Sequence, residues 1–416
     1  MTAEELPKRA RPLWQEFSVP CRFPVHFTRE VFFQKNEVLA EVMHSPSGPA
    51  AVFPVVDAGV ACAHPLLGER LRGYAASRPE ALTLVSPLHI LPGGEKCKQG
   101  AGQVEKLYSL FLEHNLCRHA VVLAIGGGAF LDVAGFAAAT AHRGIRLVRM
   151  PTTTLAQNDS GVGVKNGYNA FGRKNWVGSF TPPFAVVNDF EFLQTLTPRQ
   201  RRSGLAEAVK VAVLKDPRFF RFLCTASRAL AGFSRRAEEA MIVRCAQLHM
   251  LHTAGADPFE QGSARPLDFG HWSAHAMEEW SGGAILHGEA VAVGMALDSC
   301  YAAEKGLLLP SEKEQILRLL RGLGFRLSHP ALGYLDLRES LERFRQHLGG
   351  APSITLPFGL GRSIEVHEMD LPLLHRCQEW LLSLPENGEP QHGRKLPAVG
   401  STNAGTRFPG LPLPTT

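Results

Sequence analysis

Five ionisable residues in otherwise apolar stretches are of types that can form a metal site. Glu207 and Lys210 lie three residues apart in the segment SGLAEAVK, so on a helix they share one face. His271 and His275 are four residues apart in DFGHWSAH, and His287 begins the segment HGEAVAVGM. A lone buried histidine is more often a hydrogen-bonded core residue. One carboxylate with imidazoles in helix-rich segments nevertheless favours a catalytic divalent cation with open coordination positions.

Glycines and hydroxyl side chains follow two apolar runs in the first half. The triplet Gly126, Gly127 and Gly128 lies between an apolar run and a helical one. It is not the G-x-G-x-x-G fingerprint and could be only a tight turn, but the strand-glycine-helix context favours a pyrophosphate site. The segment PTTTLAQND, residues 151–159, also follows a strand, at the edge where α/β proteins bind ligands. Its hydroxyls could hold a ribose or a nicotinamide amide, or could simply form a turn.

A third group of polar residues occupies the segment KNGYNAFGRKN, residues 165–175, between two probable strands. It includes Lys165, Lys174 and Asn175, with an arginine and further asparagines among glycines. A solvated hairpin would account for this composition. So many hydrogen-bond donors close to a threonine-rich turn also suit a phosphorylated polyol, which we favour.

The elements that must position these residues divide the chain near residue 190. The first part alternates short apolar runs with helical stretches, which predicts a parallel α/β sheet. Its predicted strands are 51–57, 82–85, 120–125, 146–151 and 184–189. The second part has helical patterns at 201–214, 235–251, 273–280, 289–305 and 311–323. We expect a flexible arm at 1–20, a dinucleotide-binding α/β domain at 21–190, a helical metal-binding domain at 191–385 and a disordered tail at 386–416.

Composition excludes several classes of protein. With 45% hydrophobic and 20% charged residues and a net charge of +5, the chain has the composition of a globular protein. No nucleic-acid motif accompanies the basic residues, so we expect an anionic metabolite as ligand and no nucleic acid. The eight cysteines form no C-x-x-C pair, and no apolar run is long enough for a signal peptide or a membrane span. We therefore expect a cytoplasmic protein.

The motifs together resemble the dehydroquinate synthase-like sugar phosphate cyclases, over about residues 50–370. The resemblance rests on GGGAFLDVAGF, AHRG, PTTTLAQNDSGVGVKNG, RKN, SGLAEAVK, DFGHWSAH and LHGEAVAVGMAL, in this order. It implies an NAD-binding α/β domain, a helical metal domain and a homodimer. It also implies a closed redox cycle, in which oxidation of a ring hydroxyl permits phosphate elimination, and reduction and an aldol step then close a carbocycle.

The resemblance also implies a role for each matching residue. The equivalents of Glu207, His271 and His287 would bind zinc or cobalt. The candidates for contact with the dinucleotide are Asp57, Glu95, Lys98, Gly126, Gly127, Gly128, Asp132, Thr152, Thr153, Leu155 and Asp159. The candidates for contact with the substrate are Lys165, Lys174, Asn175, Lys210, Asp268 and His275, with Arg143 reaching the phosphate of the neighbouring subunit.

One segment departs from dehydroquinate synthase itself, which uses R-x-x-L-N-x-G-H and an upstream lysine to bind a substrate carboxylate. The corresponding residues here read ARPLDFGH, with Asp268 in place of the asparagine and Arg265 displaced by one position. No upstream lysine or late D-K-K loop is found. Fewer cations and one more acceptor favour a neutral polyol, sedoheptulose 7-phosphate, as in the valiolone synthase branch.

Three other functions remain open at this point. A dehydroquinate synthase would need Arg265, or another cation, to hold its keto-acid substrate. A metal-dependent polyol dehydrogenase would share the glycine turn and the metal domain but would produce NADH. A non-catalytic binding protein on the same fold would lack bound NAD and metal.

Overall fold

The first half of the chain forms a parallel sheet that is buried on both faces. Its apolar strands can be buried in this way because successive side chains point to opposite faces of the sheet. The computed structural model describes residues 12–255, 257–260, 267–348 and 353–385. The sheet has the order β1-β9-β6-β5-β2-β3, and β4 also pairs with β2; every pairing is parallel. Its strands are β1 (Val25–Thr28), β2 (Ala50–Asp57), β3 (Leu82–Leu84), β4 (His89–Leu91), β5 (Val121–Gly126), β6 (Arg146–Pro151) and β9 (Ala185–Asp189).

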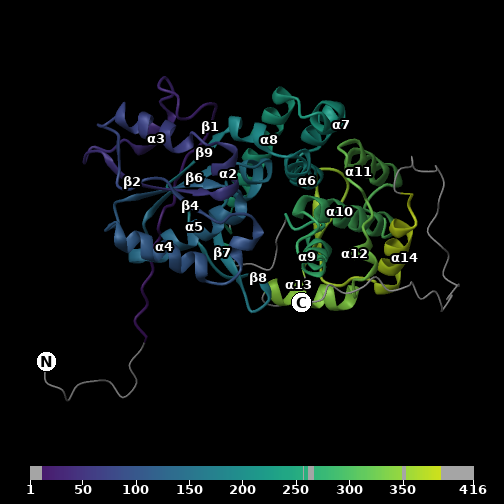
Figure 1. Cartoon of the computed structure of the whole chain (residues 1–416). Helices are drawn as coiled ribbons and strands as arrows, with labels where there is room; N and C mark the ends of the chain where they lie inside the picture. The colour runs from purple at the N-terminus through teal and green to yellow at the C-terminus, as the bar shows by residue number, and fades with distance from the viewer. Residues whose placement is uncertain (1–11, 256, 261–266, 349–352, 386–416) are drawn as a thin grey trace, which may run out of the picture.

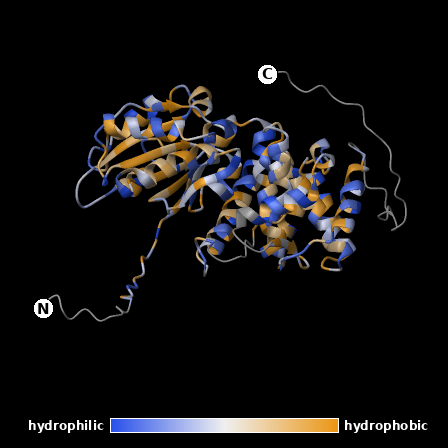
Figure 2. Cartoon of the chain, turned by 90° about the horizontal axis from the view of Figure 1, so that it is seen from below, coloured by the Kyte–Doolittle hydropathy of each residue, from blue (hydrophilic) through white to orange (hydrophobic). Residues whose placement is uncertain are grey.

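Helices lie on both faces of this sheet, whose strands are largely hydrophobic (Figure 2). In β5, Val121 and Leu123 pack into the cluster that includes α1 and α3, whereas Val122 and Ala124 pack into the cluster that includes α4 and α5. This alternation follows from the two-residue period of a strand. The elements around the sheet are α1 (Val38–Met43), α2 (Ala58–Ala63), α3 (Leu67–Ala76), η1 (Glu95–Lys98), α4 (Gly102–Glu113), α5 (Gly128–Thr140), η2 (Ala141–Arg143), η3 (Ala156–Ser160) and η4 (Phe190–Thr195).

The second half is a helical body beside the sheet (Figure 1). Its helices are α6 (Pro198–Lys215), α7 (Pro217–Ala231), α8 (Arg235–Thr253), α9 (His271–Trp280), α10 (His287–Glu304), α11 (Pro310–Gly322), α12 (Pro330–Gly333), α13 (Leu337–Leu348) and α14 (Leu371–Leu382). Helix α10 lies at the centre of the largest apolar cluster, and fourteen of its residues are buried. Among the described helices, none is both long enough and apolar enough to cross a membrane.

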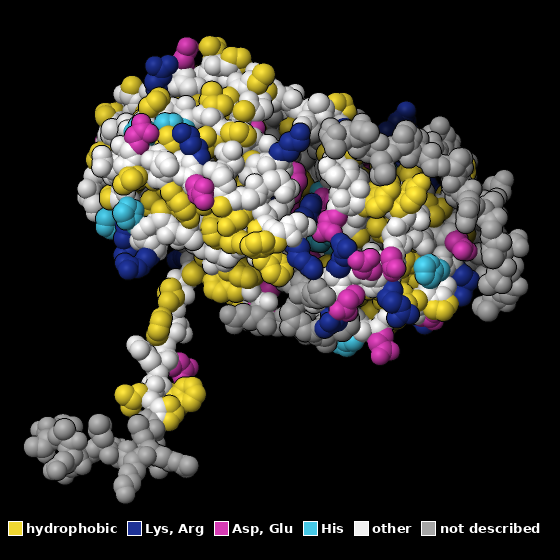
Figure 3. All heavy atoms as spheres, turned by 60° about the horizontal axis from the view of Figure 1, so that its bottom comes forward, with side chains coloured by type: hydrophobic (Ala, Val, Ile, Leu, Met, Phe, Trp, Pro, Cys, Tyr) yellow, Lys and Arg dark blue, Asp and Glu magenta, His cyan; other side chains and the backbone are white. Residues whose placement is uncertain are grey.

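Two antiparallel hairpins complete the described chain. Strands β7 (Lys165–Ala170) and β8 (Arg173–Phe180) pair with each other, and so do β10 (Ile354–Pro357) and β11 (Ser363–Val366). Before β1, residues 12–23 form an arm without regular structure, on which Leu13, Trp14 and Phe17 are exposed (Figure 3).

The fold class expected from the sequence is confirmed: a parallel α/β sheet is followed by a mainly helical region. All five predicted strands are present within one or two residues of the expected bounds. The β10–β11 hairpin and helices α7 and α14 were not predicted. The domain boundary near residue 190 stays a prediction, and the proposed disordered tail at 386–416 lies outside the described residues.

Candidate functional site

The glycine and threonine motifs lie at one edge of the sheet. Gly126, at the end of β5, pairs with Pro151, at the end of β6, so the residues that follow both strands emerge side by side. Asp57 ends the neighbouring strand β2, and its side chain accepts a hydrogen bond from the Gly59 amide at 2.7 Å. The carboxyl ends of these strands form the crevice in which open α/β sheets bind ligands.

The N-terminus of α5 provides donors for an anion at this edge. Helix α5 begins at Gly128. Its N-cap residue is Gly127, which has no side chain that could cap the first amides of the helix. A Cβ atom on Gly128 would lie 2.4 Å from Ser160 Oγ, so a larger residue there would displace the Ser160 side chain. Ser160 Oγ and Thr152 Oγ1 are buried without a hydrogen-bond partner among the described residues. Unpartnered hydroxyls beside free helical amides suit the polar groups of a dinucleotide.

Five of the candidate residues form a polar cluster between α5, η1 and the β7–β8 hairpin. Lys98 is buried and donates to Asp132 Oδ2 at 2.7 Å and to Asn175 Oδ1. Burial lowers the pKa of Lys98, but Asp132 outweighs this and holds the pKa above its usual value. Glu95 lies 3.7 Å from Lys174 Nζ. The cluster therefore joins residues expected to bind dinucleotide with residues expected to bind substrate.

The threonine-rich segment leads into the π-helical turn η3, which is in contact with the helical half. Thr153 Oγ1 accepts from the Ala156 amide at 3.1 Å, and Leu155 precedes the turn. In η3, Asp159 Oδ1 lies 2.8 Å from His249 Nδ1 of α8. Burial would raise the pKa of Asp159, but Lys210 and His249 outweigh it and hold it far below its usual value. Asp159 therefore carries a negative charge against the helices that form the metal cluster.

Glu207, His271 and His287 come together although they belong to α6, α9 and α10. Glu207 Oε1 lies 3.6 Å from His271 Nε2 and 3.3 Å from His287 Nε2. One potential ligand atom from each of the three residues lies within 4.8 Å of the others. Neither carboxylate oxygen of Glu207 makes a well-aligned hydrogen bond with any described residue, although both are buried. Such a donor set, with nitrogen and oxygen atoms converging from three sides, suits a divalent metal.

Close helix contacts bring these three residues together. A Cβ atom on Gly288 would lie 2.1 Å from the Ser203 carbonyl oxygen, so the start of α10 rests directly on α6. A Cβ atom on Gly294 would lie 2.0 Å from the Gly270 carbonyl oxygen, so α10 also touches the start of α9. Gly270 itself has a φ of +78°, which favours glycine. The two contacts fix the positions of His271 and His287 relative to Glu207.

Hydrogen bonds orient His271 at the start of α9. Its Nδ1 lies 3.0 Å from the Phe269 carbonyl oxygen, which leaves Nε2 directed at Glu207. The residues on either side are held by Asp298, a fully buried carboxylate in α10. Asp298 accepts from the Gly270 amide and from the Trp272 indole nitrogen, both at 2.9 Å. Burial raises the pKa of Asp298 to about 7.

The cluster is strongly charged in an apolar body. Burial would raise the pKa of Glu207, but Lys210, which forms an ion pair with it, lowers the value to about 2. Burial would lower the pKa of Lys210, but Glu207 and Asp159 outweigh it and raise the value. Burial lowers the pKa of His275 to about 3, so this histidine is neutral at neutral pH. Glu207 and Lys210 thus form a buried pair of opposite charges.

The remaining candidates for substrate contact differ in how far they are exposed to solvent. Lys165 is exposed and pairs with Glu260 at 2.6 Å, and Lys174 pairs with Glu278 at 2.9 Å. Asp268 is half-buried before α9, and its charge acts on Lys210 and His271. Arg143 is exposed in η2 with a φ of 63°. Arg265, the alternative carboxylate ligand, lies outside the described residues.

Three residues at the site were not predicted. Glu278 contacts both Lys174 and His287, His249 pairs with Asp159, and Asp298 supports the start of α9. A glutamate three residues after His275 on a helical pattern would share its face, so spacing could have suggested Glu278. Asp298 is the one acidic residue in the apolar segment AVAVGMALDSC, which was also a usable signal. Nothing local in the sequence links His249 to Asp159.

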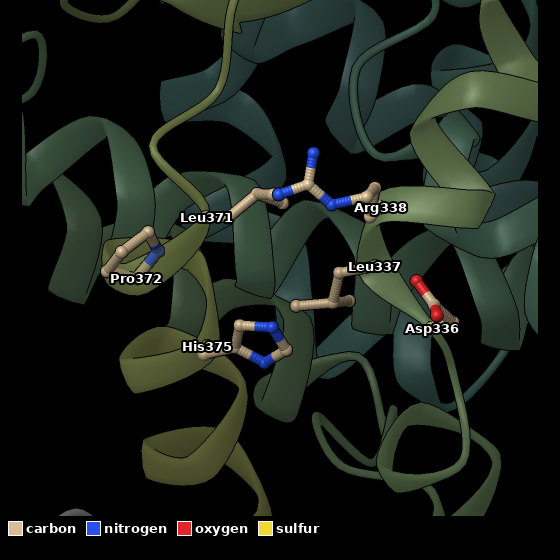
Figure 4. A pocket seen from close by; sticks show the side chains of 6 residues that line it. All are labelled: Asp336, Leu337, Arg338, Leu371, Pro372 and His375. Atoms are coloured by element: carbon tan, nitrogen blue, oxygen red, sulfur yellow. The ribbon is translucent and has the colours of Figure 1, made fainter.

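An open pocket elsewhere in the helical half is separate from this chemistry. It lies between the start of α13 and α14 and is lined by Asp336, Leu337, Arg338, Leu371, Pro372 and His375 (Figure 4). None of the candidate metal, dinucleotide or substrate residues contributes to it, so we assign it no role in the site.

Two family models match adjoining parts of the chain. The family model for the N-terminal part of 3-dehydroquinate synthase matches residues 88–203, and the model for its C-terminal part matches residues 204–347. The chain belongs to the dehydroquinate synthase-like sugar phosphate cyclases. The metal cluster is therefore assembled entirely from the part of the chain that matches the C-terminal family model.

Known relatives place the chain near the valiolone synthases. It is 35% identical over 350 residues to 2-epi-5-epi-valiolone synthase of Streptomyces glaucescens. This alignment covers 84% of this chain and 88% of the relative. It is 38% identical over 276 residues to 2-epi-valiolone synthase of Actinosynnema mirum. This alignment covers 65% of this chain and 72% of the relative. The solved structure of ValA, the 2-epi-5-epi-valiolone synthase of Streptomyces hygroscopicus subsp. jinggangensis 5008, was determined with NAD+ and Zn2+ bound. It superposes with a TM-score of 0.79 at 29% identity, over 88% of this chain and 99% of that one.

Proposed function

We propose that this cyclase converts sedoheptulose 7-phosphate into a carbocyclic product that keeps the seven carbons of the sugar and has lost the phosphate. The reaction would use NAD and a bound zinc or cobalt ion. It would act as a carbon-oxygen lyase without net oxidation or reduction. The observation that carries the proposal is the buried Glu207–His271–His287 cluster, whose carboxylate oxygens lack well-aligned hydrogen bonds among the described residues. The NAD+ and Zn2+ of ValA support the same choice of cofactors.

The residues present fit both groups. Glu207, His271 and His287 would hold the metal, and the free amides of α5 with Thr152 and Ser160 would hold the dinucleotide phosphates and ribose. When bound, NAD supplies reversible hydride transfer at a ring carbon, and the metal supplies Lewis-acid polarisation of the hydroxyl on that carbon.

The surrounding side chains would bind the sugar phosphate. Lys165, Lys174 and Asn175 project from the β7–β8 hairpin, which suits charge-assisted hydrogen bonds to a phosphate. Lys210 keeps its charge beside Glu207 and can stabilise negative charge that develops on a ring oxygen. His275, neutral at neutral pH, can donate or accept a hydrogen bond with a hydroxyl. Arg143, exposed in η2, would reach the phosphate of a second subunit in a homodimer.

Asp268 supports a neutral polyol as substrate over a keto acid. Its carboxylate lies before α9, where its charge acts on Lys210 and His271. A carboxylate there accepts hydrogen bonds from hydroxyls and repels a second carboxylate. The valiolone synthases among the relatives support this choice of branch.

The test is phosphate release by the metal-loaded protein with NAD, measured separately for sedoheptulose 7-phosphate and for the keto-acid phosphate used by dehydroquinate synthase. Release from the sedoheptulose alone is expected. We also expect Asp268→Asn to shift the ratio of the two kcat/KM values toward the keto acid, because it removes the repelling charge. Release from the keto acid alone would make this chain a divergent dehydroquinate synthase.

A further inference from the structure

Glu278 contacts two side chains that belong to different parts of the site. It lies on α9, and its side chain is only 6% exposed. Its Oε1 accepts from Lys174 Nζ of β8 at 2.9 Å, and its Oε2 lies 3.3 Å from His287 Nδ1 of α10. One carboxylate therefore joins a candidate substrate ligand to a candidate metal ligand.

The contact with His287 determines which ring nitrogen is available to a metal. His287 lies between two carboxylates: Nδ1 faces Glu278, and Nε2 faces Glu207 Oε1 at 3.3 Å. A carboxylate that accepts the Nδ1 hydrogen fixes the tautomer whose Nε2 lone pair is free. In metal sites, such a partner also fixes the orientation of the ring and increases its basicity.

The contact with Lys174 connects the hairpin to the helical half. Lys174 lies between Glu278 and Glu95, so alternating charges run from η1 through the hairpin to α9 and α10. Burial would raise the pKa of Glu278, but His287 and Lys174 outweigh it, and the carboxylate stays charged. Removing a partner from a buried carboxylate is destabilising, so Glu278 depends on both contacts.

We propose that Glu278 is a positioning residue that orients His287 toward the metal through one oxygen and holds Lys174 beside the substrate through the other. The assignment rests on the proposed function for the role of Lys174 but not for its effect on metal binding. It predicts that loss of Glu278 weakens metal binding and substrate binding together, whereas loss of Lys174 weakens only substrate binding.

A different role for Glu278 would be direct ligation of a second ion. Potential ligand atoms of His275, Glu278 and His287 also lie within 4.8 Å of one another. The Lys174 ammonium group, however, is bound to the same carboxylate at 2.9 Å and would repel a dication there. The positioning role is therefore favoured, and metal stoichiometry distinguishes the two.

The experiment is a Co2+ titration of the metal-free full-length protein, followed by visible absorption and by equilibrium dialysis. Glu278→Gln removes the charge but keeps the shape of the side chain, and we expect Co2+ binding about 10- to 100-fold weaker, with an altered Co2+ spectrum. Lys174→Met should bind Co2+ like the wild type. Glu279→Gln is the matched control, because Glu279 is the next residue on α9 and pairs with Arg343 instead. The wild type should bind one Co2+ per chain.

Steady-state kinetics provide the second readout. The KM for the sugar phosphate should rise in both Glu278→Gln and Lys174→Met and stay unchanged in Glu279→Gln. If Glu278→Gln does not fold, Glu278→Asp keeps the charge, and its Co2+ affinity should lie below that of the wild type because the carboxylate is drawn back from His287.

Wild-type Co2+ affinity and spectrum in both Glu278 variants would overturn the proposal. So would two Co2+ ions per wild-type chain with one lost in Glu278→Gln, since Glu278 would then be a ligand. Failure of the proposed function looks different: Co2+ binding would still depend on Glu278, but no sugar phosphate would be turned over.

Discussion

The sheet edge and the metal cluster gather polar groups in opposite ways. At the sheet edge, the available donors are mostly backbone amides and hydroxyls, such as those of Gly128, Thr152 and Ser160. In the helical half, Glu207 and Lys210 are ionised and buried, and each is held in its charged state by the other. Backbone groups stay in place as long as the sheet folds, whereas buried charges depend on every partner. The helical site should therefore be far more sensitive to single substitutions.

The largest effect is expected for Glu207→Ala. It removes a metal ligand and leaves Lys210 buried without its nearest counter-charge, so we expect loss of bound metal, no detectable turnover and about 3 kcal/mol of lost stability. Metal content, phosphate release and chemical denaturation measure these three consequences. Glu339→Ala, at an exposed ion pair on α13, is the control. Full activity without bound metal would contradict the assignment.

A smaller effect is expected for Gly288→Ala, which alters packing without removing a ligand. The added Cβ atom would meet the Ser203 carbonyl oxygen at 2.1 Å, so α10 must move away from α6 and take His287 with it. We expect metal affinity to fall at least about tenfold and stability to fall by about 1–3 kcal/mol. Gly73→Ala in α3, where no atom lies within 4 Å of the new Cβ, should leave metal affinity unchanged and should not lower stability. Metal affinity equal to that of the wild type would mean that this helix contact does not position His287.

The sheet half should give a milder and separable defect. Lys98→Met leaves Asp132 without its ammonium partner and releases Asn175, so we expect the KM for NAD to rise about tenfold. Metal content should not change, because Lys98 contacts no residue of the metal cluster in the described structure. Loss of metal in this variant would show that the two sites are not separable.

The smallest effect concerns pH. Burial raises the pKa of Asp298 from 3.8 to about 7, so the folded protein retains a proton that the unfolded chain releases between these values. Stability should therefore fall gradually as the pH rises from about 4 to about 7. Asp298→Asn cannot ionise, so its free energy of unfolding should decline less over this range. Denaturation at several pH values measures the difference, and parallel pH profiles for the two proteins would contradict the expectation.

The two halves also differed in how far the sequence could predict them. The strands β2 and β5 were predicted because each is a largely continuous apolar run, and β6 was predicted although it contains two arginines. The glycines directly follow β5, and the threonines directly follow β6. Glu207, His271 and His287 could be named, and the structure brings them together, but their separation of eighty residues gives no geometry. The strands β1 and β4 were missed because four and three residues are too few to show a period.

Residues that act through other residues were the hardest to predict. Glu278 and Asp298 matter because of partners on other elements, namely Lys174 and His287 for Glu278, and Gly270 and Trp272 for Asp298. Such pairs depend on how α9 and α10 pack, which no local pattern determines. Spacing could have singled out the two residues, but the assembled fold was needed to identify their partners.

The most direct test of the account is to supply sedoheptulose 7-phosphate in large molar excess over NAD and follow phosphate and NADH together in the metal-loaded protein. A cyclase that returns its hydride should release phosphate in proportion to the sugar consumed, far beyond the amount of NAD, while NADH does not accumulate. NADH that accumulates with the sugar consumed, without phosphate release, would contradict the account and identify a polyol dehydrogenase instead.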